Sequence, residues 1–330
     1  MRKASTNRVI VQAPARLHLG FMDLHGGLGR CFGSLGLTLE DVCARVAAEV
    51  HSTMIAEGKE QARVQALLEA LAALLPPGKG ALVQVEQVIP AHAGLGSGTQ
   101  LALAVGTAVA RLHGLALEPR DLARVLDRGA RSGIGIGAFE RGGFLVDGGR
   151  GSGDGPAPIV SRMPFPPAWR AVLVLDREAS GLHGHAEITA FQHLPRFPAD
   201  TAAHLCRLVL MQALPALAEA DLPRFGEAVT TLQRTVGDYF APAQGGRYAS
   251  PRVAEMLALF ESEGVTCIGQ SSWGPTGFGI VESEEQAEEL TRIAQGRAAP
   301  SLELRICAGR NHGADFRVEA ALGRVADASR

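Results

Sequence analysis

Residues Pro90–Gln100 read Pro-Ala-His-Ala-Gly-Leu-Gly-Ser-Gly-Thr-Gln and join an expected strand to an expected helix. Apolar and polar side chains alternate in Ala81–Ile89, as in a strand, and the alanine-rich segment Thr99–His113 is typical of a helix. Gly94, Gly96 and Gly98 allow backbone amides to turn toward one point, and a helix N-terminus adds partial positive charge. The stretch therefore predicts a phosphate-binding loop, with Ser97 and Thr99 as hydroxyl donors. An ordinary tight turn between strand and helix is the alternative.

This loop matches neither of two common phosphate-binding patterns. No Gly-Lys-Ser/Thr follows it, as a P-loop requires, and Thr99 stands where a dinucleotide fingerprint needs its third glycine. The prediction rests on the spacing of the glycines and on their place between a strand and a helix.

Hydrophobic spacing predicts the elements on both sides of the loop. We expect strands at Arg8–Gln12, Cys43–Val50, Ala171–Leu175, Val265–Gly269, Gly277–Val281 and Leu302–Cys307, and helices at Gln61–Leu75, Pro119–Ala130, twice within Thr201–Val236, at Pro251–Glu263 and after the capping box Ser283–Gln286. Helices and strands alternate without a strict strand–helix–strand rhythm, which predicts the α+β class. Five prolines in Pro156–Pro167 indicate a boundary between two domains, 1–162 and 163–330.

The segment Pro14–Asp23, directly after the first expected strand, carries a second group of polar side chains. Arg16 and His18 alternate to the same side of an extended chain. With Asp23 nearby, they are suited to contact a phosphate and a divalent cation. A ladder of charges on an edge strand is the alternative.

Two further glycine-rich stretches are candidate binding loops. Gly269–Gly277 contains Gln270, Ser271, Ser272 and Trp273, and an aromatic face beside hydroxyls and an amide suits a flat ligand. A hairpin loop whose tryptophan packs on the core is the alternative. In 129–155, eleven glycines accompany Arg131, Glu140, Arg141 and Asp147, which we expect on flexible backbone, either at a functional site or as solvated charges on a surface loop.

Composition excludes several classes. Glycine accounts for 40 of 330 residues without a collagen period, and 46% hydrophobic residues are too many for a disordered chain. A net charge of −2 argues against a nucleic-acid binder. No apolar stretch long enough for a membrane span or a signal peptide is present, and the five cysteines are scattered. We expect a cytoplasmic protein with reduced thiols.

Taken in their order along the chain, the four motifs resemble the GHMP small-molecule kinase superfamily, and one branch in particular, the β-ribofuranosylaminobenzene 5'-phosphate synthases. The matching stretches are Ala15–His18, Gly96–Gln100, Gly135–Phe144 and Gly269–Pro275. The resemblance implies a ribosomal-protein-S5-domain-2-like N-terminal domain and a ferredoxin-like C-terminal domain. It further implies condensation of 5-phosphoribosyl 1-diphosphate with 4-aminobenzoate or 4-hydroxybenzoate, with loss of diphosphate and CO2, in tetrahydromethanopterin biosynthesis.

Departures from the superfamily's kinases favour this branch. Many of those kinases carry Ser-Gly-Ile-Asp, with the aspartate as proposed base, where this chain has Ser132–Gly135 and ends the motif on glycine. Arg16 stands in place of the kinase lysine. The segment Gly181–Glu187 also departs from the branch, because His183 and His185 replace residues of its usual pattern, and its role stays open.

Site roles follow from the resemblance and from side-chain chemistry. Phosphate or diphosphate is expected at Gly94, Gly96, Ser97, Gly98, Thr99 and Gln100, and the aromatic or ribose group at Gln270, Ser271, Ser272 and Trp273. We expect Arg16 and His18 to bind diphosphate or the benzoate carboxylate, and Asp23 or Glu140 to hold Mg²⁺, with Glu140 also among the catalytic groups. Small molecules are the expected partners, without nucleic acid or membrane, and the chain is expected to form a homodimer. An ATP-dependent small-molecule kinase and an inactive binding protein are the alternative functions.

Overall fold

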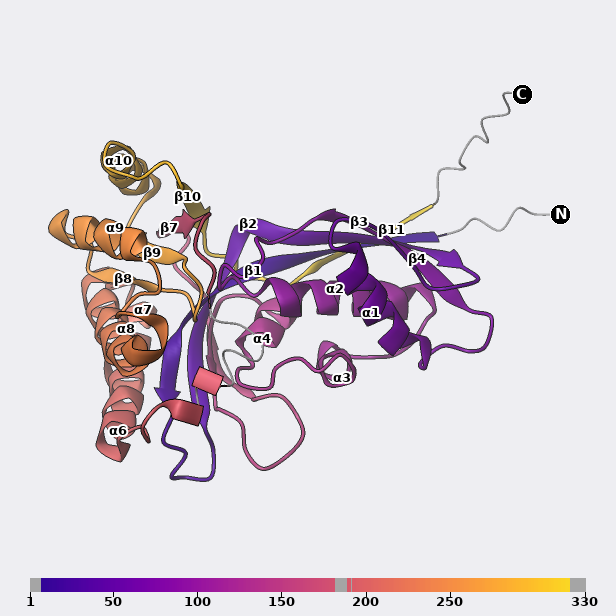
Figure 1. The fold of residues 1–330 in the computed structure, drawn as a ribbon, viewed down its shortest axis with the longest axis horizontal. Helices are drawn as coiled ribbons and strands as arrows, with labels where there is room; N and C mark the ends of the chain where they lie inside the picture. The colour runs from indigo at the N-terminus through magenta and orange to yellow at the C-terminus, as the bar shows by residue number, and fades with distance from the viewer. Residues whose placement is uncertain (1–6, 182–188, 191, 321–330) are drawn as a thin grey trace.

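The computed structural model describes residues 7–181, 189–190 and 192–320, which form two antiparallel-rich sheets with helices packed against them. In Figure 1 the four-stranded sheet and helices α6–α10 lie at the left, and the seven-stranded sheet with α1–α4 lies at the right. The mixed helices and sheets confirm the predicted α+β class.

The larger sheet is built on two long strands, β1 (Asn7–Asp23) and β2 (Phe32–His51), which form one antiparallel hairpin. The strands follow the order β11-β1-β2-β4-β3, and β5 pairs with β2 and with β6. The remaining bounds are β3 Ile55–Gly58, β4 Gly80–Gln87, β5 Phe144–Asp147, β6 Ile159–Met163 and β11 Asp315–Ala320. The strands expected at Arg8–Gln12 and Cys43–Val50 are parts of this hairpin.

Four helices cover one face of this sheet: α1 (Gln61–Ala72), α2 (Ser97–Leu112), α3 (Pro119–Val125) and α4 (Ile134–Glu140). Helix α2 lies at the centre, and eleven consecutive residues of it, 100–110, are buried. Its small side chains allow neighbouring elements to approach on every side. The predicted helix Thr99–His113 is thereby confirmed to within two residues.

The surface-loop interpretation of 129–155 is wrong for its central part. Ile134–Glu140 forms α4 and Phe144–Asp147 forms β5, and every residue of β5 is buried. Glycines in α4 allow close packing, because a Cβ on Gly135 would lie 3.0 Å from Cγ2 of Thr99. The glycine content therefore reflects tight packing of a short helix as well as turns.

The smaller sheet has the order β10-β7-β9-β8 and is antiparallel throughout. Numbered along the second half of the chain, the order is 4-1-3-2, which is the ferredoxin-like arrangement. The strands are β7 Arg170–Asp176, β8 Cys267–Gln270, β9 Gly277–Val281 and β10 Leu302–Ala308. Helices α9 (Pro251–Ser262) and α10 (Glu284–Gln295) pack on one face. Ser283 caps α10 as its sequence predicts, by accepting from the Gln286 amide at 3.2 Å.

The other face of the smaller sheet meets α6 (Ala199–Leu208), the π-helical turn η1 (Val209–Ala213), α7 (Leu214–Ala218) and α8 (Leu222–Gln244). The run 199–218 is long and apolar enough to cross a membrane by length and composition alone. Its inner side chains, including Leu205 and Val209, are packed in the core, so the run forms one layer of a folded domain.

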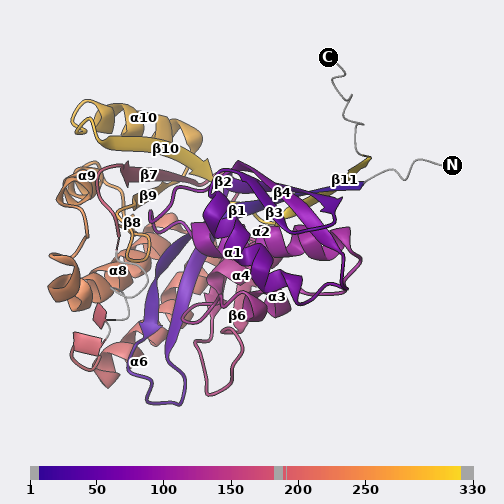
Figure 2. The ribbon, with the colours of Figure 1, turned by 45° about the vertical axis from the view of Figure 1, so that its right-hand side comes forward.

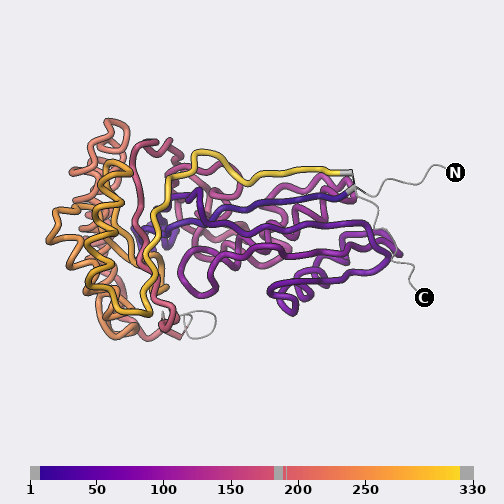
Figure 3. The backbone as a smooth tube through the Cα atoms, turned by 90° about the horizontal axis from the view of Figure 1, so that it is seen from above, coloured from indigo at the N-terminus to yellow at the C-terminus, as the bar shows by residue number. Residues whose placement is uncertain are grey.

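One core joins the two sheets. Leu17 and Leu19 of β1 belong to the same buried cluster as Leu173 of β7 and Leu232 of α8. Strands β1 and β2 reach toward α6 in Figure 2, and in Figure 3 the C-terminal strand β11 runs beside the N-terminal strand β1. Strand β11 pairs with β1, so the second half of the chain also supplies a strand to the first sheet. The division at 162/163 stays a prediction.

Candidate active site

Strand β1 lies directly against the glycine loop. The Arg16 amide donates to the carbonyl of Leu95 at 3.2 Å, and the Arg16 guanidinium donates to the carbonyl of Gly94. Gly96, in the left-handed region with φ 82°, caps α2 without any side-chain hydrogen bond. The first amides of α2 therefore keep their donor capacity beside an arginine, which is the arrangement that binds anions.

The loop after β8 ties the first two motifs together through Ser271, which is fully buried. Its hydroxyl accepts from the His18 amide at 2.9 Å and donates to the Gly94 carbonyl at 2.7 Å. The Ser272 amide donates to the His18 carbonyl at 3.1 Å. Residues near positions 16, 94 and 271 thus meet at one place, as the motif order predicts.

Gly94 is required by this junction. Its φ is +77°, and a Cβ there would overlap the carbonyl oxygen of Ser271 and lie 3.0 Å from Cα of Gly274. Only a residue without a side chain lets the two loops touch backbone to backbone.

The third motif, Gly135–Phe144, supports the helix that follows the glycine loop. Gln100 is completely buried, and its side-chain amide donates to the Gly135 carbonyl at 2.7 Å. Thr99 packs on the same glycine. Thr99 and Gln100, which we expected to bind phosphate, therefore also hold α2 against α4.

Asp147 is the buried centre of this support. Its carboxylate accepts from the amides of Ser34, Gly133 and Gly149 at 2.9–3.2 Å, and from the hydroxyls of Ser34 and Ser132. Burial raises the pKa of Asp147, and these donors oppose that shift. The sequence predicted Asp147 on flexible backbone, which is wrong because its side chain is enclosed and bonded to residues far apart in the chain.

His18 is a buried, neutral imidazole. Its exposed fraction is 2%, and within the described residues neither ring nitrogen has a hydrogen-bond partner. Burial lowers the pKa of His18 to about 3, and the nearby Arg16 charge lowers it further. The ring borders a cavity of about 30 Å³ that is also lined by Gln233, Gln270 and Ser272. His18 can therefore exchange hydrogen bonds with a ligand but supplies no positive charge to an anion.

Trp273 belongs to the core as well as to this cavity. It is 3% exposed, and its ring centroid lies 4.2 Å from that of Phe240. Core packing, the alternative reading of this tryptophan, thus accounts for one face of its ring. A volume of about 30 Å³ matches one water molecule. An aromatic ligand of the kind expected at this loop would have to bind at the mouth of the cavity or widen it.

The two carboxylates expected to hold Mg²⁺ lie apart. Asp23 ends β1 and accepts from the amides of His25 and Gly26, whereas Glu140 ends α4 and pairs with Arg120 at 3.6 Å. The carbonyl of Phe139, the residue before Glu140, accepts from the Ala314 amide. Ala314 directly precedes β11, whose first residue pairs with Gln12 of β1, so Glu140 lies near that end of β1. Eleven residues of strand separate Gln12 from Asp23, or on the order of 30 Å.

The described residues thus do not form a protein-built Mg²⁺ site from Asp23 and Glu140, and they contain no cluster of three metal-ligating side chains. Burial raises the pKa of Glu140, and the nearby arginines oppose the shift. Mg²⁺ and the role of Glu140 stay predictions. His183 and His185 lie outside the described residues.

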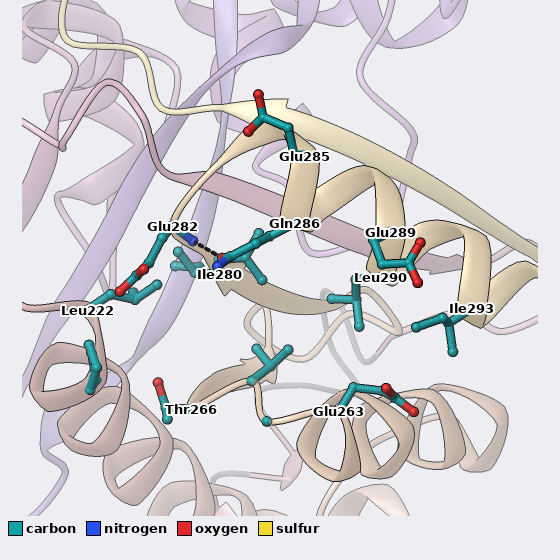
Figure 4. A pocket seen from close by; sticks show the side chains of 14 residues that line it. Leu222, Glu263, Thr266, Ile280, Glu282, Glu285, Gln286, Glu289, Leu290 and Ile293 are labelled. Atoms are coloured by element: carbon teal, nitrogen blue, oxygen red, sulfur yellow. Dashed lines mark hydrogen bonds between the residues drawn. The ribbon is translucent and has the colours of Figure 1, made fainter.

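A larger cavity, about 580 Å³, lies elsewhere, between α10, the end of β9 and the start of α8 (Figure 4). Apolar side chains such as Ile280 and Leu290 line it, with Glu263, Glu282, Glu285 and Glu289 at its rim. None of the described residues that line it is basic, and none belongs to the four motifs. Its negative charge repels phosphate, so the smaller, arginine-flanked junction is the candidate site.

Comparison with known proteins agrees with this assembly of motifs. The family model for the GHMP kinases N terminal domain matches residues 62–143, and the model for the GHMP kinases C terminal domain matches residues 213–298. A β-ribofuranosylphenol 5'-phosphate synthase of Archaeoglobus fulgidus is 35% identical over 286 residues, which cover 83% of this chain and 88% of that protein. The chain belongs to this family. Its counterpart in Methanothermobacter thermautotrophicus is 32% identical over 93% of this chain and 98% of its own.

Solved structures confirm the predicted GHMP-kinase-like fold. A homoserine kinase of Cytophaga hutchinsonii superposes with a TM-score of 0.62 over 96% of this chain and 99% of its own, at 16% identity. A mevalonate diphosphate decarboxylase of Staphylococcus aureus gives 0.65 over 94% and 98%, at 14% identity. Members of the synthase family are enzymes, and the family shows that this chain is one.

Proposed function

We propose that this chain condenses 5-phosphoribosyl 1-diphosphate with 4-hydroxybenzoate, or with 4-aminobenzoate, and releases diphosphate and CO2. The observation that carries the proposal is the identity of 32–35% to β-ribofuranosylphenol 5'-phosphate synthases over most of the chain. The junction of Arg16, the glycine loop and Ser271 supports it, because this reaction needs a site for a departing anion.

The reaction makes a carbon–carbon bond at the sugar. The bond from the anomeric carbon to diphosphate breaks with its electron pair on diphosphate, which leaves an oxocarbenium-like centre. The ring carbon that bears the carboxylate attacks this centre, pushed by the para hydroxyl or amino group. The bond to the carboxylate then breaks, its electron pair restores the aromatic ring, and CO2 departs.

The residues at the junction suit the charges in these steps. Amides of Gly96–Thr99 at the uncapped start of α2 would bind the diphosphate or phosphate oxygens, with Arg16 beside them. His18, being neutral, would hydrogen-bond a ligand group at the small cavity without attracting the anion. The packed loops would keep water from the sugar cation.

The name shared by the relatives, a ribofuranosylphenol 5'-phosphate synthase, favours the hydroxyl acceptor, because a phenol product follows from 4-hydroxybenzoate. An amino acceptor would yield the aminobenzene product instead. We propose 4-hydroxybenzoate as the first acid to test.

An ATP-dependent kinase is the second candidate, favoured by a 4-diphosphocytidyl-2-C-methyl-D-erythritol kinase of Rhodopseudomonas palustris that is 28% identical over 70% of this chain. Gly135, which ends the Ser-Gly-Ile motif, argues against it, because this glycine packs on Thr99 where a carboxylate would need room.

The proposal also covers the pathway, the cellular location, the oligomeric state and the metal. The family resemblance supports a place in tetrahydromethanopterin biosynthesis and a homodimer. The scattered cysteines support a cytoplasmic location, and the charge of a departing diphosphate supports a requirement for Mg²⁺.

Product analysis tests the reaction. The protein is incubated with 5-phosphoribosyl 1-diphosphate and each aromatic acid, and in parallel with ATP and sugar or alcohol acceptors. We expect a mass corresponding to the ribofuranosylphenol 5'-phosphate in the first arm and no ADP in the second. ADP formation without that product would establish the kinase instead.

A further inference from the structure

We propose that Gln233 of α8, which lies outside all four motifs, selects the para substituent of the aromatic acid. Its side-chain amide donates a hydrogen bond to a para hydroxyl group that enters the cavity beside His18. The reaction in which the acid is used rests on the proposed function, whereas the preference of this cavity for a hydroxyl group does not.

The side chain of Gln233 is held with its NH2 group toward this cavity. Gln233 is 6% exposed, and its Oε1 accepts from the Gln270 backbone amide at 2.9 Å. A backbone amide can only donate, so this contact identifies the oxygen and leaves Nε2 at the other end. A Cβ on Gly20 would lie 3.7 Å from that Nε2, and Gly20 lines the cavity together with Gln233. In the described chain this NH2 group has no acceptor of its own, so it is available to a ligand.

Glycines on two strands fix the position of Gln233. Gly20 of β1 has a φ of +118°, and a Cβ there would overlap Cδ2 of Leu232. A Cβ on Gly269 of β8 would lie 2.5 Å from Cδ of Gln233. Both strands therefore touch α8 at positions without a side chain, which leaves the Gln233 amide little freedom to rotate.

His18 supplies the complementary acceptor. Its ring is 2% exposed, and neither ring nitrogen has a hydrogen-bond partner in the described part of the chain. Because the ring is neutral, one nitrogen carries a proton and the other accepts. Phe21 packs edge-on against it, with the ring centroids 4.6 Å apart, and limits its rotation. The cavity thus offers one fixed donor and one acceptor to a single group.

The size and charge of the cavity match a hydroxyl group and not a carboxylate. Its volume of about 30 Å³ holds one group of the size of a water molecule. Arg247 is the one charged side chain among the described residues that line it, and its Nε and Nη2 donate to the Asp238 carboxylate at 2.7 and 2.9 Å. Among these residues no charge is left unpaired to attract the carboxylate of the acid.

The place of the cavity on β1 suits the far end of the acid. Arg16, beside the glycine loop, and His18 lie on the same side of the strand two residues apart, which is about 7 Å. A benzene ring spans most of this distance. The attacked ring carbon can therefore lie at the junction while the para group reaches the cavity.

These contacts distinguish a hydroxyl from an amino group. A phenol oxygen accepts from Gln233 and donates to His18 at the same time. An aromatic amine has two N–H donors and a lone pair that is delocalised into the ring, so it accepts poorly from the Gln233 amide. Binding the amine leaves a buried donor facing another donor, which we expect to cost about tenfold or more in affinity.

Substitution of Gln233 tests this assignment. Gln233→Met removes the donor and keeps a side chain of similar length. We expect the ratio of kcat/KM for 4-hydroxybenzoate to kcat/KM for 4-aminobenzoate to fall about tenfold or more. A merely structural role would lower both values alike and leave the ratio unchanged. Gln233→Glu keeps the acceptor for the Gln270 amide and should lower the ratio as well.

Gln244→Met is the matched control. Gln244 lines the same cavity, but its Nε2 donates to the Arg247 carbonyl at 2.9 Å and its Oε1 accepts from the Gln270 side chain at 3.4 Å. Both ends of this amide are therefore used within the protein. The ratio should change by less than about twofold in this variant.

Calorimetric binding separates this inference from the proposed function. Each acid is titrated into the protein with ribose 5-phosphate and inorganic diphosphate present, which allows no turnover. We expect the wild-type protein to bind 4-hydroxybenzoate about tenfold or more tightly than 4-aminobenzoate, and both Gln233 variants to lose this preference, even if no CO2 is released from the complete reaction. Equal or undetectable binding of both acids by the wild-type protein would overturn the inference. So would a preference that survives in a Gln233 variant with an unchanged thermal midpoint.

Discussion

The buried imidazole of His18 makes a quantitative prediction about pH. Its folded-state pKa of about 3 lies below the ordinary value of 6.5, so the folded protein keeps this ring neutral while the unfolded chain binds a proton. The stability associated with the neutral ring is complete well above pH 6.5 and is lost as the pH falls toward 3. The slope in that window is about 1.4 kcal/mol per pH unit.

Between pH 7.5 and 4.5 the linkage lowers the free energy of unfolding by about 3 kcal/mol. The assay is urea unfolding at half-unit steps of pH, for the wild-type protein and for His18→Gln, which has no titrating group at this position. Other titrating residues are common to both proteins, so the difference between the two curves isolates His18.

We expect the wild-type protein to lose about 3 kcal/mol more than His18→Gln over this range. A change in the difference of less than about 0.5 kcal/mol would refute a buried neutral imidazole. It would also remove the reason for treating His18 as a hydrogen-bonding group and not as a cation at the site.

Three further substitutions probe the junction and the hydrogen-bond network of Asp147. Ser271→Ala leaves the buried His18 amide without its acceptor and should lower the free energy of unfolding by about 2 kcal/mol, measured by urea titration. The control is Ser262→Ala, at the exposed end of α9, which should cost less than about 1 kcal/mol in the same assay. Gly94→Ala should cost at least about 2 kcal/mol and abolish diphosphate binding by calorimetry, whereas Gly114→Ala, with φ +68° and open space, should cost only about 1. Asp147→Asn places an amide against backbone donors and should lower stability by about 2 kcal/mol, and an unchanged thermal midpoint would contradict the network around it.

Several helices were predictable because their signals are local, whereas α4 was not, because its glycines indicate a loop. Hydrophobic spacing and a double proline predict the helix of Gln61–Leu75, which the structure forms as α1, and Ser283 caps α10 as expected. The meeting of Arg16, Gly94 and Ser271 was foreseen only through the motif order of the family, since no local pattern states which loops touch.

The length of β1 was missed because it is buried on both faces over much of its course. Its odd-numbered residues pack under the helices from Val9 to Ala13 and in the larger core from Ala15 to Phe21. Ile10, Pro14 and His18 on the other face are buried as well, so polar residues do not alternate regularly with apolar ones. Two register shifts, at Pro14/Arg16 and His18/Gly20, further interrupt the pattern. Strand β11 was missed because its partner lies 300 residues earlier.

The polar centre at Asp147 was also beyond local reasoning. Its donors come from residues 34, 132, 133 and 149, so the carboxylate is satisfied only once two strands and a helix have packed together. A carboxylate among glycines predicts an exposed loop until those partners are known.

Release of CO2 tests the central claim most directly. The protein is mixed with 5-phosphoribosyl 1-diphosphate and carboxyl-labelled 4-hydroxybenzoate, and labelled CO2 and diphosphate are counted together, with 4-aminobenzoate in a parallel reaction. We expect one CO2 for each diphosphate from at least one of the two acids. Diphosphate release without CO2, or no release from either acid, would contradict the assignment of this chain as the synthase.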